Sequence, residues 1–185
     1  MKILDIGSGV ASVAALVFSD VKDKEIVRMD ANESLKPDIV HDITTPLPEN
    51  LLGQFDIVYV SHVLEHIDRL KVIQTLAFLS KALKNMGEMW VIVPSMEWAA
   101  SEILHGRDGL HTQGMIWGGQ NTEWDYHRCG FTLASLRQLF EILQLVVRKA
   151  YQSPFGIVMG ENEFKCVQNV VIGARYDEIT KHAET

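Results

Sequence analysis

The stretch Met1-Lys-Ile-Leu-Asp5-Ile-Gly7-Ser-Gly9 decides the fold, because an apolar strand over residues 2–6 runs directly into a turn with two glycines. Glycine has no Cβ and tolerates positive φ, so such a turn brings the backbone close to a nucleotide-like ligand. The apolar residues over 11–18 predict a short helix, which completes a strand–turn–helix unit. Turns of this kind occur in many α/β proteins, so the ligand has to be inferred from the residues that follow.

Strands and helices alternate along the rest of the chain. Further strands are expected over residues 25–29, 38–41, 55–60, 88–93, 145–151 and 166–175, and helices over 69–83 and 133–143. This alternation is typical of a parallel sheet with helices on both faces. We therefore expect an α/β fold with a doubly wound, mostly parallel seven-stranded sheet.

The composition narrows the class of protein. A chain of 185 residues with 47% hydrophobic content fits one domain over 1–185. No apolar run approaches the ~20 residues of a membrane helix, and no secretory signal precedes the first strand. Two cysteines, Cys129 and Cys166, are too few for a disulfide framework, so a cytoplasmic protein without a membrane partner is expected. The net charge of −7 argues against a nucleic-acid partner.

One segment, residues 95–130, breaks the alternation. It holds six glycines, three histidines and three tryptophans, and it shows no periodicity after its first ten residues. Long loops in compact domains are usually functional or disordered, and the aromatic content argues against disorder. We interpret the segment as a lid on the substrate side. Within it, Glu123-Trp-Asp-Tyr-His-Arg128 suits either a polar pocket wall or a loop anchor.

Polar residues follow the ends of successive predicted strands, where open α/β sheets bind ligands. Asp30 lies about 20 residues beyond the glycine turn, and a carboxylate in that place suits the vicinal hydroxyls of a ribose. Asp42 can accept a hydrogen bond from a purine amine while Ile43 packs on the purine face. Ser61 and His62 follow the next strand. These positions predict an adenosine site.

Together these residues resemble the class I S-adenosylmethionine-dependent methyltransferases, in particular the small-molecule, methyltransferase-11-like members. The segments that carry the resemblance are Ile3-Leu-Asp-Ile-Gly-Ser-Gly9, Asp30-Ala31, His41-Asp42-Ile43 and Phe55-Asp-Ile-Val-Tyr-Val-Ser-His-Val-Leu-Glu-His66. The resemblance implies a Rossmann-like methyltransferase fold whose last strand is antiparallel. It also implies S-adenosylmethionine as cofactor and methyl transfer to a small-molecule acceptor, for example a sugar, a lipid precursor or another metabolite.

The resemblance further implies which residues bind the cofactor. Those implied at its methionine end are Asp5, Gly7, Gly9, Ser61 and His62. Those implied at its adenosine portion are Asp30 on the ribose and Ala31, Asp42 and Ile43 on the adenine. The chain departs from the family where Ala11 replaces a third glycine, which requires a negative φ there.

The sequence indicates the catalytic residues less clearly than the cofactor-binding residues. An acceptor that must lose a proton needs a base, and His127 and His111 are the candidates because imidazole titrates near neutrality. No metal site is expected, since the histidines of the lid and Cys129 lack the paired spacing of structural zinc sites. Glu65 and His66, at the start of a helical segment, are interpreted as capping or surface residues.

Two alternatives to a methyltransferase remain. One is a non-catalytic S-adenosylmethionine-binding module that acts as a partner subunit or in a homodimer, suggested by Ala11 and by a first strand that no helix precedes. The other is a nicotinamide-dependent dehydrogenase. It is disfavoured, because Ser12 stands where the dinucleotide-binding motif requires its third glycine.

Overall fold

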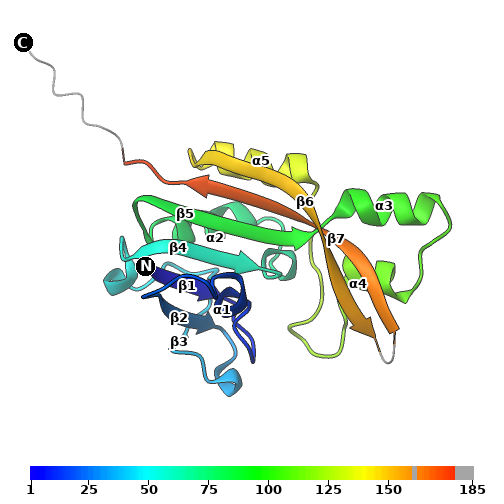
Figure 1. The fold of residues 1–185 in the computed structure, drawn as a ribbon, viewed down its shortest axis with the longest axis horizontal. Coiled ribbons are helices and arrows are strands. Elements are labelled where there is room, and N and C mark those ends of the chain that lie inside the picture. Colours follow the sequence, from blue (N-terminus) through cyan, green and yellow to red (C-terminus); the bar gives the residue numbers. More distant parts are fainter. Residues whose placement is uncertain (160–161, 178–185) are drawn as a thin grey trace, which may run out of the picture.

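A computed structural model describes residues 1–159 and 162–177 of the chain (Figure 1). Its seven-stranded sheet has the order β3-β2-β1-β4-β5-β7-β6. The strands are β1 (Lys2–Ile6), β2 (Glu25–Asp30), β3 (Ile39–Val40), β4 (Phe55–Ser61), β5 (Leu83–Pro94), β6 (Val146–Met159) and β7 (Asn162–Ala174). Pairs among β1 to β5 are parallel, whereas β7 is antiparallel to both β5 and β6. The predicted α/β class and the antiparallel last strand are confirmed.

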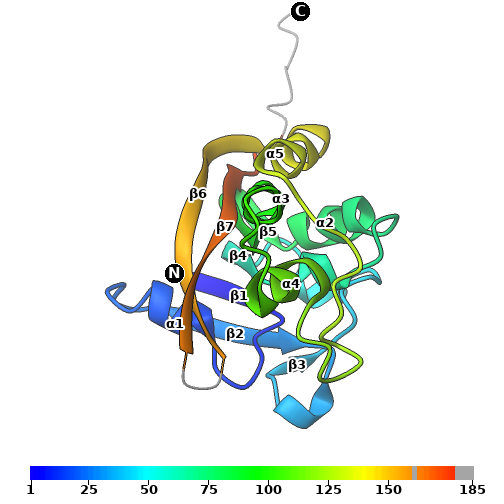
Figure 2. The same cartoon turned by 90° about the vertical axis from the view of Figure 1, so that its right-hand side faces the viewer.

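Helices cover both faces of this sheet, as predicted (Figure 2). On one face, α2 (Val72–Ser80) and α5 (Leu133–Ile142) insert Leu76 and Phe140 into a core that includes Leu4 and Val58. On the other face, α1 (Val13–Val17) and the adjoining Phe18 pack against a smaller apolar cluster. Alternate residues of the central strands are therefore buried on opposite faces, as in other parallel sheets.

The smaller core depends on aromatic contacts. The Phe18 ring meets Tyr59 edge-on with a centroid separation of 5.8 Å, and it meets Trp90 at 5.1 Å. Edge-on pairs at such separations are favourable beyond the area that they bury. Helix α1 has only five residues, so these aromatic side chains supply much of the cover on this face.

Several predicted boundaries differ from the structure. The helix expected over 69–83 is shorter, because Leu83 already pairs with Phe55 and begins β5 before the predicted residue 88. Strand β6 continues past residue 151 and β7 begins before residue 166. The far halves of these two strands pair only with each other in the described sheet, since β5 ends where Pro94 meets Gln168. Pro154 and Gly156 in this hairpin concealed the strand pattern.

The segment 95–130, which showed no extended periodicity, contains two short helices beside β7 (Figure 1). These are α3 (Met96–Leu104) and α4 (Leu110–Trp117). Ser95 caps α3 by accepting a hydrogen bond from the Trp98 N–H at 3.2 Å. Only one residue of α3 and two of α4 are fully buried, so neither helix carries an apolar stripe that a sequence pattern can detect.

A buried polar hub joins the start of this segment to the sheet. Asn169 of β7 donates through Nδ2 to the Phe131 carbonyl and to the Glu97 carboxylate, both at 3.0 Å. Its Oδ1 accepts from Gln152 Nε2 at 3.1 Å, and the same amide donates to Ser95 Oγ at 2.8 Å. Because Asn169 is completely buried, its side-chain amide depends on these protein partners for its hydrogen bonds, and the bond to the Phe131 carbonyl is itself buried. No described helix is long and apolar enough to cross a membrane.

We predict that Asn169→Ala lowers the free energy of unfolding by about 2–4 kcal/mol, because the Glu97 carboxylate and the Gln152 amide each lose a partner, and the Phe131 carbonyl keeps only its bond from the Met96 N–H. Urea denaturation followed by circular dichroism measures the change. The exposed Asn50 provides the control, since Asn50→Ala is expected to alter stability by less than about 0.5 kcal/mol. Equal effects of the two substitutions would contradict the role of the hub.

Candidate active site

A pocket of about 460 Å³ opens at the carboxyl ends of β1, β2 and β4. It lies where β1 pairs with β2 on one side and with β4 on the other, so the loops that follow these strands diverge. Six of the nine residues that the sequence assigned to a cofactor line it. These are Gly7, Asp30, Ala31, Asp42, Ile43 and His62.

The glycine turn is held tightly against the neighbouring strand. Gly7 has a φ of +62°, and its N–H donates to the Met29 carbonyl at 2.8 Å. Gly9 has a φ of +60°, and its N–H donates to Asp30 Oδ2 at 3.1 Å. Ala11 is not among the residues with positive φ, as the replacement of a third glycine required. The altered turn therefore keeps the conformation of a strand-to-helix loop.

Two carboxylates that line the pocket, Asp30 and Asp42, can each accept further hydrogen bonds from a ligand. Asp30 accepts one backbone N–H on each oxygen, from Gly9 and, at 2.9 Å, from Asn32. Each of these oxygens retains a second lone pair for a ligand hydroxyl. Asp42 accepts the Thr44 N–H on Oδ1 at 2.9 Å, and no described residue donates to its Oδ2.

The other three predicted cofactor residues lie beside the pocket and do not line it. Asp5 is 2% exposed and accepts a hydrogen bond from the Ser12 hydroxyl, which in turn caps α1. Burial raises the pKa of Asp5 above its ordinary value, against the lowering effect of that hydrogen bond. Gly9 uses its N–H on Asp30, and Ser61 ends β4 opposite Ile92. Asp5 and Gly9 therefore stabilise the glycine turn and the start of α1, and Ser61 completes the end of β4.

His62 occupies an unusual backbone position at the mouth of the pocket. Its φ of +54° is rare for a residue with a side chain and recurs at functional sites. Its Nε2 lies 2.9 Å from Gln168 Oε1, and its Nδ1 lies 3.3 Å from Glu65 Oε1. Burial lowers the pKa of His62, but the Glu65 carboxylate and the Gln168 amide together raise it to a net value above the ordinary one.

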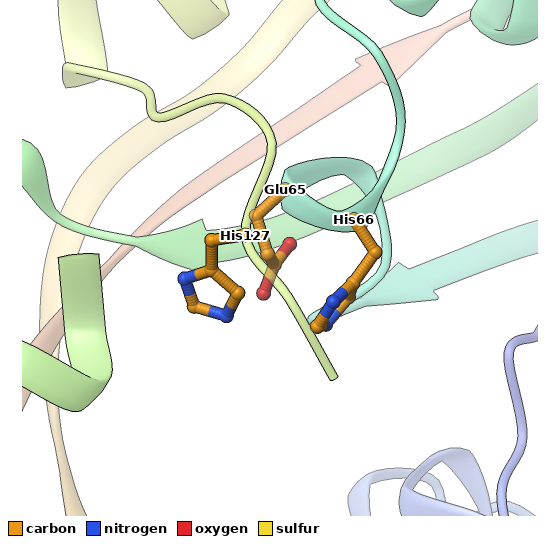
Figure 3. A group of neighbouring side chains, drawn as sticks. All are labelled: Glu65, His66 and His127. Atoms are coloured by element: carbon orange, nitrogen blue, oxygen red, sulfur yellow. The ribbon is translucent and has the colours of Figure 1, made fainter. Parts of the chain in front are cut away.

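Glu65, His66 and His127 form a compact group, called here the Glu65 cluster (Figure 3). One ligand-type atom from each residue lies within 4.8 Å of the other two. Figure 3 shows the Glu65 carboxylate between the two imidazole rings, whose centroids are 4.9 Å apart. Burial lowers the pKa of His127 below its ordinary value, which favours the neutral imidazole. Of these three residues His66 lines the pocket, as does the neighbouring His62, so the cluster lies at the pocket's edge.

The far end of the predicted lid supplies the remaining wall of the pocket, through Glu123, Trp124 and Arg128. The Arg128 N–H donates to the Glu65 carbonyl at 2.7 Å, which ties this segment to the turn after β4. Cys129 follows with its thiol directed at the Leu64 carbonyl at 3.4 Å. Burial raises the pKa of Cys129 to about 11, so it stays a thiol and is no nucleophile at neutral pH.

The two predicted catalytic histidines lie in different environments. His127 belongs to the Glu65 cluster, whereas His111 on α4 stacks on Phe164 of β7 with a centroid separation of 4.6 Å. His111 is not part of the pocket lining. The association of Glu65 and His66 with His127 was not predicted from the sequence. The spacing His62-x-x-Glu65-His66 was a usable signal, because residues three and four apart share one face of a helical turn.

The comparisons with known proteins agree with this geometry. The sequence model of a family described as a methyltransferase domain matches residues 1–150. A SAM-dependent methyltransferase from Methanosarcina mazei has a TM-score of 0.68 at 16% identity, over 96% of this chain and 93% of its own. One from Archaeoglobus fulgidus has a TM-score of 0.61 at 18% identity, over 94% and 86%.

An O-methyltransferase family 2 protein from Planctomyces limnophilus, solved in complex with apigenin, has a TM-score of 0.62 at 13% identity, over 94% of this chain and 50% of its own. No curated protein matched the sequence. The chain belongs to the class I S-adenosylmethionine-dependent methyltransferases and is a methyltransferase. Membership implies S-adenosylmethionine as the methyl donor.

The glycine turn yields a paired prediction. A Cβ on Gly7 would lie 2.4 Å from Val63 Cγ2, whereas a Cβ on Gly9 would meet nothing within 4 Å. Gly9→Ala should therefore lower the free energy of unfolding only by the cost of positive φ, about 1–2 kcal/mol. Gly7→Ala adds overpacking and should cost about 2–4 kcal/mol. Urea denaturation compares the two, and a larger loss at Gly9 would contradict the structure.

Proposed function

We propose that this methyltransferase transfers the methyl group of S-adenosylmethionine to a hydroxyl of a small molecule bound in the 460 Å³ pocket. The observation that carries the proposal is the convergence of Asp30 and Asp42, with free acceptor capacity, beside the glycine turn. The net charge of −7 and the two free thiols further support a cytoplasmic enzyme with a small acceptor rather than a nucleic acid.

The pocket fits the chemistry of the cofactor. Its volume lies in the range of about 300–1,000 Å³ that holds small-molecule ligands. The free lone pairs of Asp30 suit the two ribose hydroxyls, and Asp42 Oδ2 suits an exocyclic amine. Ala31 and Ile43 add apolar surface to the same wall, which suits the face of an adenine. The opposite end, near Gly7 and His62, remains for the methionine portion.

The acceptor end of the pocket is formed by the turn after β4 and by the end of the lid. Trp124 offers an aromatic surface, and Arg128 and Glu123 offer charged groups that orient a polar ligand. The O-methyltransferase solved with apigenin shares the fold, which is consistent with a compact hydroxylated acceptor. The polar hub at Asn169 holds the other end of the lid segment on the sheet.

Bound S-adenosylmethionine supplies a methyl group already activated as a sulfonium. The chain has to align the acceptor oxygen with that group, exclude water and take up the hydroxyl proton. We assign the uptake of this proton to His127 of the Glu65 cluster, because its lowered pKa favours the neutral imidazole and its neighbour His66 lines the pocket. His111 lies against Phe164 and is not assigned a role in this step.

Binding tests the placement of the ribose. Asp30→Ala is expected to weaken S-adenosylmethionine binding by about 1–3 kcal/mol, because two ligand hydroxyls lose their acceptor. Isothermal titration with S-adenosylmethionine and S-adenosylhomocysteine measures the loss. Asp20→Ala, at an exposed position away from the pocket lining, is the control and should bind like the wild type. An unchanged dissociation constant for Asp30→Ala would contradict the ribose position.

Turnover tests the enzyme against the binding-module alternative. The purified protein, incubated with S-adenosylmethionine and a library of hydroxylated metabolites, is expected to accumulate S-adenosylhomocysteine and a methylated product, both detected by mass spectrometry. Trp124→Ala should raise KM for the acceptor and leave cofactor affinity within about threefold, since its loss removes uniform acceptor binding. Binding of the cofactor without product from any acceptor would favour the module.

A further inference from the structure

Glu65 is a buried acid without a matching donor. Its side chain is 1% exposed, and neither carboxylate oxygen accepts a hydrogen bond within the described part of the chain. Nδ1 of His62 approaches Oε1 at 3.3 Å without hydrogen-bond alignment, and Oε2 has no comparable contact. Burying a carboxylate is costly, and among the described residues His62 alone lies within salt-bridge distance, at Oε1, so Oε2 is left open to a cation.

The two histidines of the cluster are oriented as ligands. Nδ1 of His66 lies 3.2 Å from the Tyr126 carbonyl, and Nδ1 of His127 lies 3.1 Å from the Met115 carbonyl. A carbonyl can only accept, so each Nδ1 carries the ring proton and each Nε2 retains its lone pair. Histidines that bind metals are held in the same way, by donating their other N–H to a carbonyl.

We propose that the Glu65 cluster is a binding site for one divalent transition-metal ion, held by the Glu65 carboxylate and by Nε2 of His66 and His127. The mutual spacing of up to 4.8 Å requires only a small contraction, since ligands at about 2.0–2.2 Å from one ion lie roughly 3–4 Å apart. The segment after His127 is already fixed, because the Arg128 and Cys129 N–H groups both donate to the Glu65 carbonyl.

The ligand set selects the class of ion. Two imidazoles and one carboxylate suit Zn²⁺, Co²⁺, Mn²⁺ or Fe²⁺, whereas Mg²⁺ and Ca²⁺ prefer sites made entirely of oxygen. Three protein ligands leave at least one coordination position open, as in catalytic rather than structural sites. Because His66 lines the pocket, an ion held by the cluster would lie at the edge of the space in which the acceptor is proposed to bind.

The consequence for catalysis rests on the proposed function. The ion would bind the acceptor hydroxyl and lower its pKa, so the hydroxyl proton leaves to solvent water. The resulting oxygen lone pair forms the bond to the methyl carbon as the methyl–sulfur bond breaks. Both electrons of that broken bond stay on sulfur, which becomes the neutral thioether of S-adenosylhomocysteine. In the metal-bound enzyme His127 would therefore hold the ion, in place of the role as proton acceptor that it has in the metal-free form.

The test starts with metal alone. Tag-free protein is stripped with a chelator and titrated with Co²⁺, whose visible absorption reports coordination, and with Zn²⁺ by calorimetry. We expect one ion per chain, a rise in melting temperature on adding Zn²⁺, and no such rise with Mg²⁺. Titration with S-adenosylmethionine on the same samples is a separate readout, so loss of cofactor binding with intact metal binding would contradict the proposed function alone.

Variants locate the site. Glu65→Gln and His127→Gln should each weaken metal binding by about 100-fold or more and abolish the Zn²⁺-dependent rise in melting temperature. The matched control is His105→Gln, because His105 is exposed and bonds only within α3 through the Ser101 carbonyl. The glutamine of Glu65→Gln has nearly the same size and shape as the glutamate and removes a buried charge. This variant should therefore fold even if His127→Gln does not.

The outcomes separate the alternatives. One ion bound by the wild type and by His105→Gln, but not by Glu65→Gln, supports the site. Absence of stoichiometric binding, or equal binding by Glu65→Gln, would overturn it. Once an acceptor is known, chelation should lower the methylation rate at least about 100-fold, with recovery on adding Zn²⁺ or Mn²⁺. Full activity after chelation would also overturn the proposal and leave His127 as the base.

Discussion

The parallel pairing of β1 with both β2 and β4 is the constraint on which the rest of the structure depends. Because the chain leaves β1 toward β2 on one side and returns to β4 on the other, the loops after β1 and β4 separate and leave a pocket between them. The hydrogen bond from the Gly7 N–H to the Met29 carbonyl then holds the glycine turn against the end of β2. Asp30 braces that turn from the end of β2.

A second dependence follows from the turn after β4. The Glu65 backbone carbonyl accepts two N–H groups from the end of the lid, while its side chain is buried beside two histidines. One residue therefore joins the sheet to the lid and also places a carboxylate at the pocket wall. This coupling explains how a long excursion through α3 and α4 returns to the site with a defined position. The hub at Asn169 holds both ends of the excursion, because it bonds Glu97 near the start and the Phe131 carbonyl directly after the end.

The sequence predicted the parts of the molecule in which local pattern and final structure agree. Strand β1 matches its predicted bounds, and Asp30, Asp42 and Ile43 meet because parallel strands end at one edge. The Glu65 cluster was not predicted, since it joins residues about sixty positions apart whose meeting depends on the path of the lid. Helices α3 and α4 were missed for a related reason: they bury few residues and are held by capping and polar contacts.

The most direct test of the central claim is a crystal structure of the protein soaked with S-adenosylhomocysteine. We predict density in the pocket after β1, with the ribose hydroxyls on Asp30, the adenine beside Ile43 and the homocysteine portion near His62. Density elsewhere on the protein, or a pocket that stays free of ligand at saturating concentration, would contradict it.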